Sequence, residues 1–154
     1  MKHINDPRFI HLTLLPAETC NFACPYCFQY RRRNKLMKPE IYEAVLNLIK
    51  KLAIENNKHG DQTFLRISWF GGELLLAVQG IICFHKKLKI LCQELPIKTS
   101  CSMVTNGYLL GNDVVQKLVE LGITDFQITL DGDELSHNKL RALKNGSPTF
   151  QTIY

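Results

Sequence analysis

The chain has 154 residues, of which 45% are hydrophobic and 21% charged, and its formal net charge is +5. This length is enough for one domain with a real core, and the balance of apolar and charged residues excludes a disordered chain. No stretch approaches the ~18 apolar residues of a membrane span. The N-terminal sequence MKHINDPRFIHL lacks the apolar region of a signal peptide. We therefore expect a cytoplasmic protein without a membrane partner, in which thiols stay reduced.

Strands and helices are predicted to alternate along the chain. Apolar patterns predict strands over 8–15, 63–70, 97–105 and 125–130, and helices over 38–58, 74–95 and 112–122. Pro39 suits the first turn of its helix, and Asn112 and Gly122 are the expected N-cap and C-cap of the last one. Strands that alternate with long helices indicate an α/β fold with parallel strands and crossover helices.

A polar or glycine-rich motif follows each predicted strand. In chain order these are a cysteine loop, Gly-Gly-Glu at 71–73, Thr-Asn-Gly at 105–107 and Asp-Gly at 131–132. The loops after the carboxyl ends of parallel strands form the ligand-binding face of such sheets. We therefore expect the four motifs to converge on one edge of one sheet.

The run YRRRNK, from Tyr30 to Lys35, is the one dense group of basic residues. No aromatic residues are interleaved within it, so we interpret it as a solvated loop rather than a nucleic-acid site. The other lysines and arginines are spread along the chain. We expect no nucleic-acid partner.

Cys20, Cys24 and Cys27 have the spacing C-x3-C-x2-C. In a reducing compartment this pattern favours metal or redox chemistry over disulfides. Structural zinc takes four ligands, usually as two separated pairs, and the next thiol, Cys83, falls within a predicted helix. Three thiolates can instead hold three irons of a 4Fe–4S cluster and leave the fourth iron open to a non-protein ligand. The spacing favours the cluster and leaves zinc as the alternative.

Cysteines also occur outside this loop, at Cys83, Cys92 and Cys101, and they match no motif. Buried thiols of this kind behave as small hydrophobic side chains. We expect that role for all of them.

The sequence resembles radical S-adenosylmethionine (radical SAM) enzymes, in particular the sulfatase maturases and related peptide-modifying members. The resemblance rests on CNFACPYC, WFGGE, MVTNGYLL and ITLDGDELSHNKLRALKNGSPTF, in that order, and it runs from about residue 10 to residue 153. It implies a 4Fe–4S cluster, reductive cleavage of S-adenosylmethionine to a 5′-deoxyadenosyl radical, and hydrogen abstraction in peptide or protein maturation. It also implies an external electron donor such as a flavodoxin or ferredoxin.

The resemblance also implies roles for individual residues. The three cysteines of the loop would hold the cluster, and the aromatic ring of Tyr26 would lie near the adenine. Gly71, Gly72 and Glu73 would meet the methionine ammonium. Arg141 would pair with the carboxylate of S-adenosylmethionine. The remaining candidates, Asn106, Thr129 and Asp131, would contact the ligand or the substrate.

Each of the later positions also has a simpler interpretation. Asn106 could occupy a left-handed turn before Gly107. Thr129 could face a wall of the fold, Asp131 could cap its turn, and Arg141 could be a surface residue. His137 is interpreted as structural rather than catalytic.

The core of this family is a partial (β/α)6 TIM-like barrel, often followed by a cluster-binding SPASM domain. Residues 1–154 match its four N-terminal strand–helix units, so we expect a truncated core domain without the remaining strands or a SPASM domain. Truncation could leave the chain inactive alone, with an unpaired strand edge. The alternative from another functional class is a non-catalytic module that binds an iron–sulfur cluster or zinc. Leu74 stands where relatives usually have proline, which should be tolerated at the opening of a helix.

Overall fold

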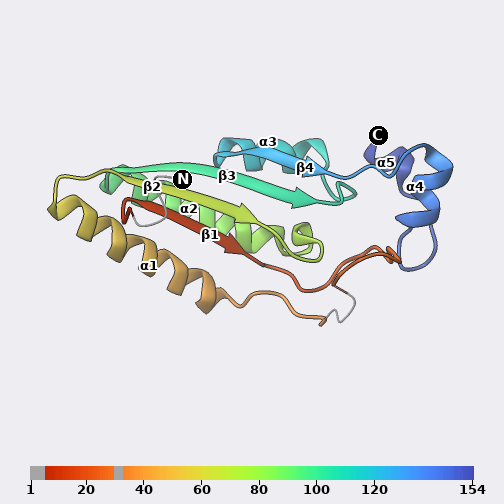
Figure 1. Cartoon of the computed structure of the whole chain (residues 1–154), viewed down its shortest axis with the longest axis horizontal. Helices are drawn as coiled ribbons and strands as arrows, with labels where there is room; N and C mark the ends of the chain where they lie inside the picture. Colours follow the sequence, from red (N-terminus) through yellow and green to blue (C-terminus); the bar gives the residue numbers. More distant parts are fainter. Residues whose placement is uncertain (1–5, 30–32) are drawn as a thin grey trace.

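The computed structural model describes residues 6–29 and 33–154. Its centre is a four-stranded sheet in the order β1-β2-β3-β4, in which every neighbouring pair is parallel. The strands are β1 (Phe9–Leu14), β2 (Thr63–Trp69), β3 (Ile97–Thr105) and β4 (Ile123–Ile128). All of them point the same way in Figure 1, so their carboxyl ends lie at one edge.

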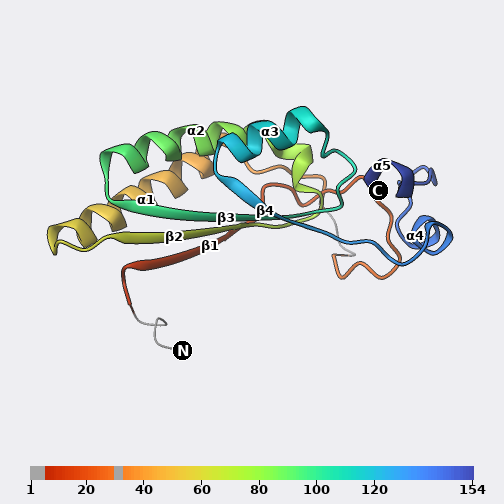
Figure 2. The ribbon, with the colours of Figure 1, turned by 90° about the horizontal axis from the view of Figure 1, so that it is seen from above.

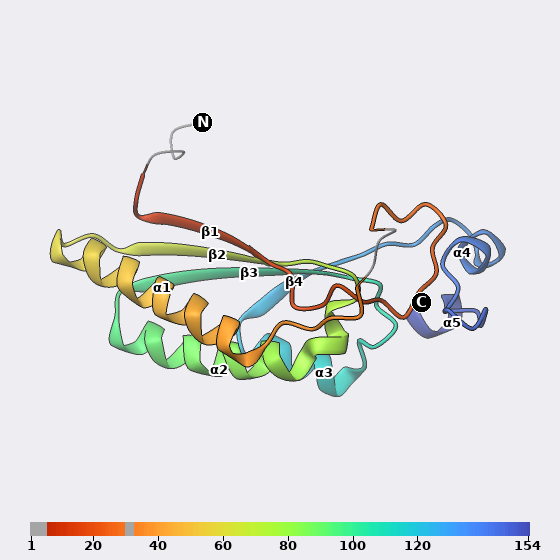
Figure 3. The same ribbon diagram turned by 90° about the horizontal axis from the view of Figure 1, so that it is seen from below.

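Three helices cover one face of this sheet. They are α1 (Pro39–Lys58), α2 (Val78–Glu94), which follows the short 3-10 helix η1 (Leu74–Ala77), and α3 (Asn112–Glu120). Figure 2 and Figure 3 show them on the same side of the strands. Two further short helices, α4 (Glu134–Leu140) and α5 (Phe150–Ile153), lie beyond the carboxyl ends of the strands (Figure 1). The predicted strands and the helices α1 and α3 are confirmed to within about two residues, α2 begins at Val78 rather than at residue 74, and α4 and α5 were not predicted.

The core lies between the sheet and these helices. Trp69 at the end of β2 is fully buried, and its ring packs edge-on against Phe84 of α2 at 5.5 Å between centroids. Its indole N–H donates to Nε2 of buried His85 at 2.9 Å. Residues of β2 alternate between buried and less buried, because only one face of the sheet is covered by helices.

The opposite face of the sheet carries polar side chains. Thr13, Ser68 and Ser102 lie side by side in the strand register. The Ser102 hydroxyl donates to that of Ser68 at 3.3 Å, and Ser68 also lies 3.1 Å from Nε2 of His11. This arrangement, with helices outside and a polar face opposite them, is what the wall of a partial barrel requires.

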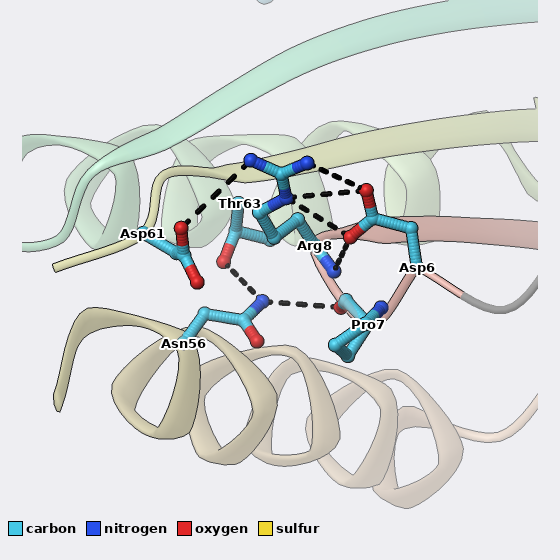
Figure 4. A network of polar contacts seen from close by, with 6 residues as sticks. All are labelled: Asp6, Pro7, Arg8, Asn56, Asp61 and Thr63. Carbon is cyan, nitrogen blue, oxygen red and sulfur yellow. Dashed lines mark hydrogen bonds and ion pairs between the residues drawn. The ribbon is translucent and has the colours of Figure 1, made fainter. Parts of the chain in front are cut away.

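A polar network fastens the amino-terminal edge of the sheet, as Figure 4 shows. The buried amide of Asn56 at the end of α1 donates to the Pro7 carbonyl at 3.2 Å and to the Thr63 hydroxyl at 2.9 Å. The guanidinium of Arg8 pairs with Asp6 and with Asp61. These contacts join the end of α1 to the starts of β1 and β2.

Three local expectations need correction. Gly111, not Asn112, is the N-cap of α3, and Gly122 follows the C-cap with a φ of +86°. The predicted helix over 74–95 is divided into η1, whose start the Glu73 side chain caps by accepting from the Leu75 N–H, and α2, which begins at Val78. No helix in the described part of the chain has the length and apolar character needed to cross a membrane.

Candidate cofactor site

The cysteine loop is closed at its base by main-chain hydrogen bonds. It runs from the end of β1 to the start of α1, and the Met37 N–H donates to the Pro16 carbonyl at 2.8 Å. Within the loop Cys20 is buried, whereas Cys24 and Cys27 are partly exposed. The Cys27 N–H donates to the Cys24 carbonyl at 3.2 Å. The described part of the loop, residues 15–29, therefore carries the three thiols at the carboxyl edge of the sheet.

The Gly-Gly-Glu turn packs directly against the main chain of this loop. The Gly72 N–H donates to the Ala17 carbonyl at 2.9 Å, and the Glu73 N–H donates to the Thr19 carbonyl at 2.7 Å. A Cβ atom on Gly72 would lie 2.1 Å from the Thr19 oxygen, and one on Gly71 would lie 2.5 Å from the Ala17 oxygen. The close approach of the chain to itself thus requires both glycines.

Glu73 ties the glycine turn to the end of β3. Its carboxylate is fully buried and accepts from the Leu75 N–H at 2.9 Å, the Thr105 hydroxyl at 2.8 Å and the Asn106 N–H at 2.8 Å. Burial raises the pKa of Glu73, and the hydrogen bonds from Asn106, Leu75 and Thr105 oppose that shift. All of these partners donate, so the geometry suits the ionised carboxylate.

Asn106 continues the connection from Glu73 to the cysteine loop. Its side-chain amide donates to the Asn21 side-chain carbonyl at 2.8 Å and lies 3.8 Å from the sulfur of Cys20. The same thiol receives the Phe22 N–H at 3.4 Å. The left-handed turn is taken by Gly107, with a φ of +82°, so the interpretation of Asn106 as the left-handed residue is wrong.

Tyr26, Asp131 and Arg141 form a second cluster at the same edge. The Tyr26 hydroxyl donates to the Asp131 carboxylate and accepts from Nη1 of Arg141 at 2.9 Å. Burial and the Asp131 carboxylate raise the pKa of Tyr26, and Arg141 opposes this. The guanidinium lies 5.7 Å above the centre of the Phe22 ring. Arg141 is only 8% exposed, so its interpretation as a surface residue is wrong.

The segment after α4 pairs with the cysteine loop, which the sequence did not suggest. The Ala23 N–H donates to the Ala142 carbonyl at 3.0 Å, and the Lys144 N–H donates to the Asn21 carbonyl at 3.0 Å. Between them, Phe22 and Leu143 form an antiparallel bridge. The resemblance to the family pointed to the stretch around Arg141 as functional. It did not indicate the pairing with the cysteine loop, because this pairing leaves no periodic pattern in the sequence.

Some predicted residues lie outside these clusters. Thr129 is exposed just beyond the end of β4. The carboxylate of Asp131 meets Tyr26 in the second cluster, and Asp133 caps α4 by accepting from the Ser136 N–H. Residues 30–32 of the basic run lie outside the described residues, and 33–35 are exposed.

The other cysteines only partly match the expectation of buried side chains. Cys101 is buried, which raises its pKa to about 11, and Cys92 is half-buried. Cys83 is exposed, so the expectation is wrong there.

The cysteine loop fits a thiolate-bound cluster in its donor chemistry. No cysteine forms a disulfide, and the Cys20 sulfur receives N–H groups of the kind that surround cluster ligands. Within residues 6–29 and 33–154, no group of three or more His, Cys, Asp or Glu side chains is gathered closely enough to hold a metal ion. The loop thus supplies three free thiols, the ligand type that an iron–sulfur cluster takes.

The fold and its loops define a class of protein, a parallel α/β sheet with a three-cysteine loop at its carboxyl edge. Residues 14–154 match the Radical SAM superfamily, and the chain belongs to that superfamily. This confirms the resemblance inferred from the cysteine, Gly-Gly-Glu and Asp-Gly motifs.

Relatives and solved structures agree with this assignment. The GTP 3′,8-cyclase of Pasteurella multocida is 30% identical over 139 residues, which are 85% of this chain and 38% of that protein. The sporulation killing factor maturation protein SkfB of Bacillus subtilis is 30% identical over 138 residues, 89% of this chain and 30% of that protein. The chain therefore spans well under half the length of these relatives.

The structure of native anSMEcpe, an anaerobic sulfatase-maturating enzyme, with bound AdoMet and Cp18Cys peptide superposes on this fold. The TM-score is 0.71 at 24% identity, over 94% of this chain and 38% of that one. This confirms the predicted fold class, the N-terminal part of a partial TIM-like barrel.

Proposed function

We propose that the chain is part of a radical SAM enzyme that binds a 4Fe–4S cluster through Cys20, Cys24 and Cys27. When bound, the cluster would supply the electron that cleaves S-adenosylmethionine to a 5′-deoxyadenosyl radical, which abstracts a hydrogen from the substrate. Membership of the superfamily supports this proposal. The three-thiol loop at the carboxyl edge of the sheet supports it independently, because three protein ligands leave one corner for the nucleotide.

The observation that carries the proposal is the hydrogen-bonded path from Glu73 through Asn106 to Cys20. It joins the glycine turn, the end of β3 and the cysteine loop, with contacts of 2.8 Å from Glu73 to the Asn106 N–H and 3.8 Å from the Asn106 amide to the Cys20 sulfur. A path of this kind fixes the loop that must present thiolates and the turn that must receive the nucleotide.

The chain's own residues would bind and orient S-adenosylmethionine. We assign Tyr26 to the adenine and the edge formed by Gly71, Gly72 and Glu73 to the ammonium, which the buried negative charge of Glu73 would attract. Arg141 would receive the carboxylate, and its buried Nε has no hydrogen-bond partner among the described residues. A buried donor without an acceptor costs about 1–3 kcal/mol, so an incoming carboxylate would remove that cost.

The proposed substrate is a peptide or protein, and the names of SkfB and of peptide-bound anSMEcpe support this choice. Asn106, Thr129 and Asp131 are assigned to the ligand or substrate side of the same edge. We further propose that residues 1–154 make up part of a core domain, that an external flavodoxin or ferredoxin supplies the electron, and that the protein is cytoplasmic. Its six thiols, none in a disulfide, fit a reducing compartment.

Anaerobic reconstitution with iron and sulfide tests the cluster. We expect about four irons per chain and a broad absorption band at about 400 nm. Cys24→Ala should abolish loading, because two thiolates cannot hold a cluster with an open corner, whereas Cys83→Ala on the exposed side of α2 should load fully. Full iron content in Cys24→Ala, or stoichiometric zinc uptake without iron, would contradict the proposal, and zinc would favour the metal-binding interaction module.

Arg141→Lys tests the nucleotide site. Lysine keeps the positive charge and loses the planar pair of donors that matches a carboxylate. We expect the affinity of the reconstituted chain for S-adenosylmethionine, measured by equilibrium dialysis, to fall about tenfold. Unchanged affinity would remove Arg141 from the site.

A further inference from the structure

A closed ring of hydrogen bonds connects the cluster of Tyr26, Asp131 and Arg141 through the interior of the C-terminal segment. The Asp131 N–H donates to Nδ1 of His137 at 3.3 Å. Nε2 of His137 lies 3.1 Å from the Thr149 hydroxyl, which donates to the Arg141 carbonyl at 2.8 Å. The ring closes through the Tyr26 hydroxyl, which contacts both the Arg141 guanidinium and the Asp131 carboxylate.

The directions of these bonds allow only one protonation state of His137. A main-chain N–H can only donate, so Nδ1 must accept from Asp131. A main-chain carbonyl can only accept, so the single hydroxyl proton of Thr149 goes to Arg141, and Thr149 must accept from Nε2. His137 is therefore the neutral tautomer that carries its proton on Nε2.

The surroundings of His137 favour this neutral form. The side chain is fully buried, and its ring packs edge-on against Phe150 at 5.5 Å. Burial lowers the pKa of His137, the positive charge of Arg141 lowers it further, and Asp131 opposes both. Arg141 and Asp131 are the charged groups that face it, and Tyr26 is the titratable group beyond them. Protonation would place an N–H on Nδ1 against the N–H of Asp131.

We propose that His137 is a positioning residue, which holds the main chain at Asp131 and at Arg141 and so sets how their side chains meet at Tyr26. Asp131 precedes α4 and Arg141 follows it. From within that helix, His137 contacts the Asp131 N–H directly and the Arg141 carbonyl through the Thr149 hydroxyl. The inference rests on the proposed function, because the side chains it positions are those assigned to S-adenosylmethionine. It also predicts that acid weakens nucleotide binding through the loss of the neutral ring.

The tautomer can be measured directly by ¹⁵N NMR on labelled chain, with or without the cluster. We expect His137 to carry its proton on Nε2. His85 is an internal reference of the opposite kind, because its Nε2 accepts from Trp69. A proton on Nδ1 of His137, or a charged ring at neutral pH, would overturn the inference.

Thr149 supplies a matched pair of variants for binding. Thr149→Val removes the hydroxyl at nearly constant shape and breaks the ring, whereas Thr149→Ser keeps it. We expect Thr149→Val to weaken S-adenosylmethionine binding to the reconstituted chain about fivefold, the loss of one hydrogen bond, and Thr149→Ser to restore it. If both variants bind like the wild type, His137 does not position the site.

His137→Phe adds a pH readout that a purely structural role would not change. Because the pKa of His137 lies below its ordinary 6.5, wild-type affinity should hold from about pH 8 to 6.5 and fall with acid below that, whereas that of His137→Phe should be lower and flat throughout. His85→Phe, which removes another buried histidine, should keep the wild-type profile. Parallel profiles for the wild type and His137→Phe would refute the inference. Failure of the wild type itself to bind S-adenosylmethionine would instead refute the proposed function. If His137→Phe does not fold, the NMR and Thr149 measurements still test the positioning role.

Discussion

Glu73→Gln tests whether a buried carboxylate holds the site together. The substitution keeps the size of the side chain and removes its charge. In the native arrangement one carboxylate oxygen accepts from Leu75 and Thr105, and the other accepts from the Asn106 N–H. A glutamine can keep the first oxygen, but its NH₂ group must then face the Asn106 N–H, so two donors would oppose each other.

The expected loss follows from these contacts. A buried donor left without an acceptor costs about 1–3 kcal/mol, and the hydrogen bonds that remain lose their charge-assisted strength. Burial raises the pKa of Glu73, so replacing the carboxylate with a neutral amide offsets part of this loss. We expect a net decrease of about 2 kcal/mol in the free energy of unfolding, which lowers Tm by about 4–8 °C for a chain of this size.

Urea unfolding followed by circular dichroism measures this change, and Glu43→Gln is the matched control. Glu43 is an exposed residue of α1 whose carboxylate pairs with Lys87 on the surface. Surface pairs contribute about 0–1 kcal/mol, so this variant should lie close to the wild type. If Glu73→Gln and Glu43→Gln lose the same stability, the carboxylate does not hold the loops and the argument fails.

The remaining predictions concern stability and thiol access. Gly72→Ala should lower the free energy of unfolding by at least about 3 kcal/mol, because its Cβ would meet a main-chain oxygen at 2.1 Å. Gly111→Ala, whose Cβ would meet nothing within 4 Å, should lower it by at most about 1 kcal/mol. Equal losses in urea unfolding would contradict this. Burial lowers the pKa of His85 from 6.5 to about 4, so the unfolded state binds the proton first as the pH falls. Stability should then decrease by up to about 1.4 kcal/mol per pH unit between pH 6.5 and about 4, with a slope that His85→Gln lacks; parallel curves would count against it. In native protein at about pH 8, iodoacetamide should label exposed Cys83 and spare buried Cys101, whose pKa is about 11. Mass spectrometry measures the labelling, and equal labelling of the two thiols would refute the burial of Cys101.

The sequence predicted the elements of the fold well because their signals are local. Strand alternation and helical spacing act over a few residues, and they placed β1 to β4 and the helices between them to within about two residues, except for the start of α2. The positions of the motifs followed, since each stands directly after a strand. The short helices α4 and α5 were missed because seven and four residues carry too little periodic pattern.

The roles of individual side chains were harder to predict. Asn106 stood as well for a turn as for a ligand contact. The structure shows that Gly107 is the left-handed residue and that the Asn106 side chain accepts from the Tyr108 N–H, and the ligand contact stays a prediction. Arg141 could have been a surface residue until its burial over Phe22 was seen. Cys83 was expected to be buried because its helix is apolar, but the rotation of α2 against the sheet exposes it.

The sequence by itself determined the order of strands and helices, the parallel sheet and the edge at which its cysteine, glycine and aspartate motifs gather, because these depend on neighbours along the chain. The tertiary structure alone decided which groups share a proton or a hydrogen bond at that edge. Asn106 and Cys20 are 86 residues apart, and Arg141 and Tyr26 are 115 apart. Contacts over such separations depend on how whole loops are placed by the packed core, and no local pattern specifies them.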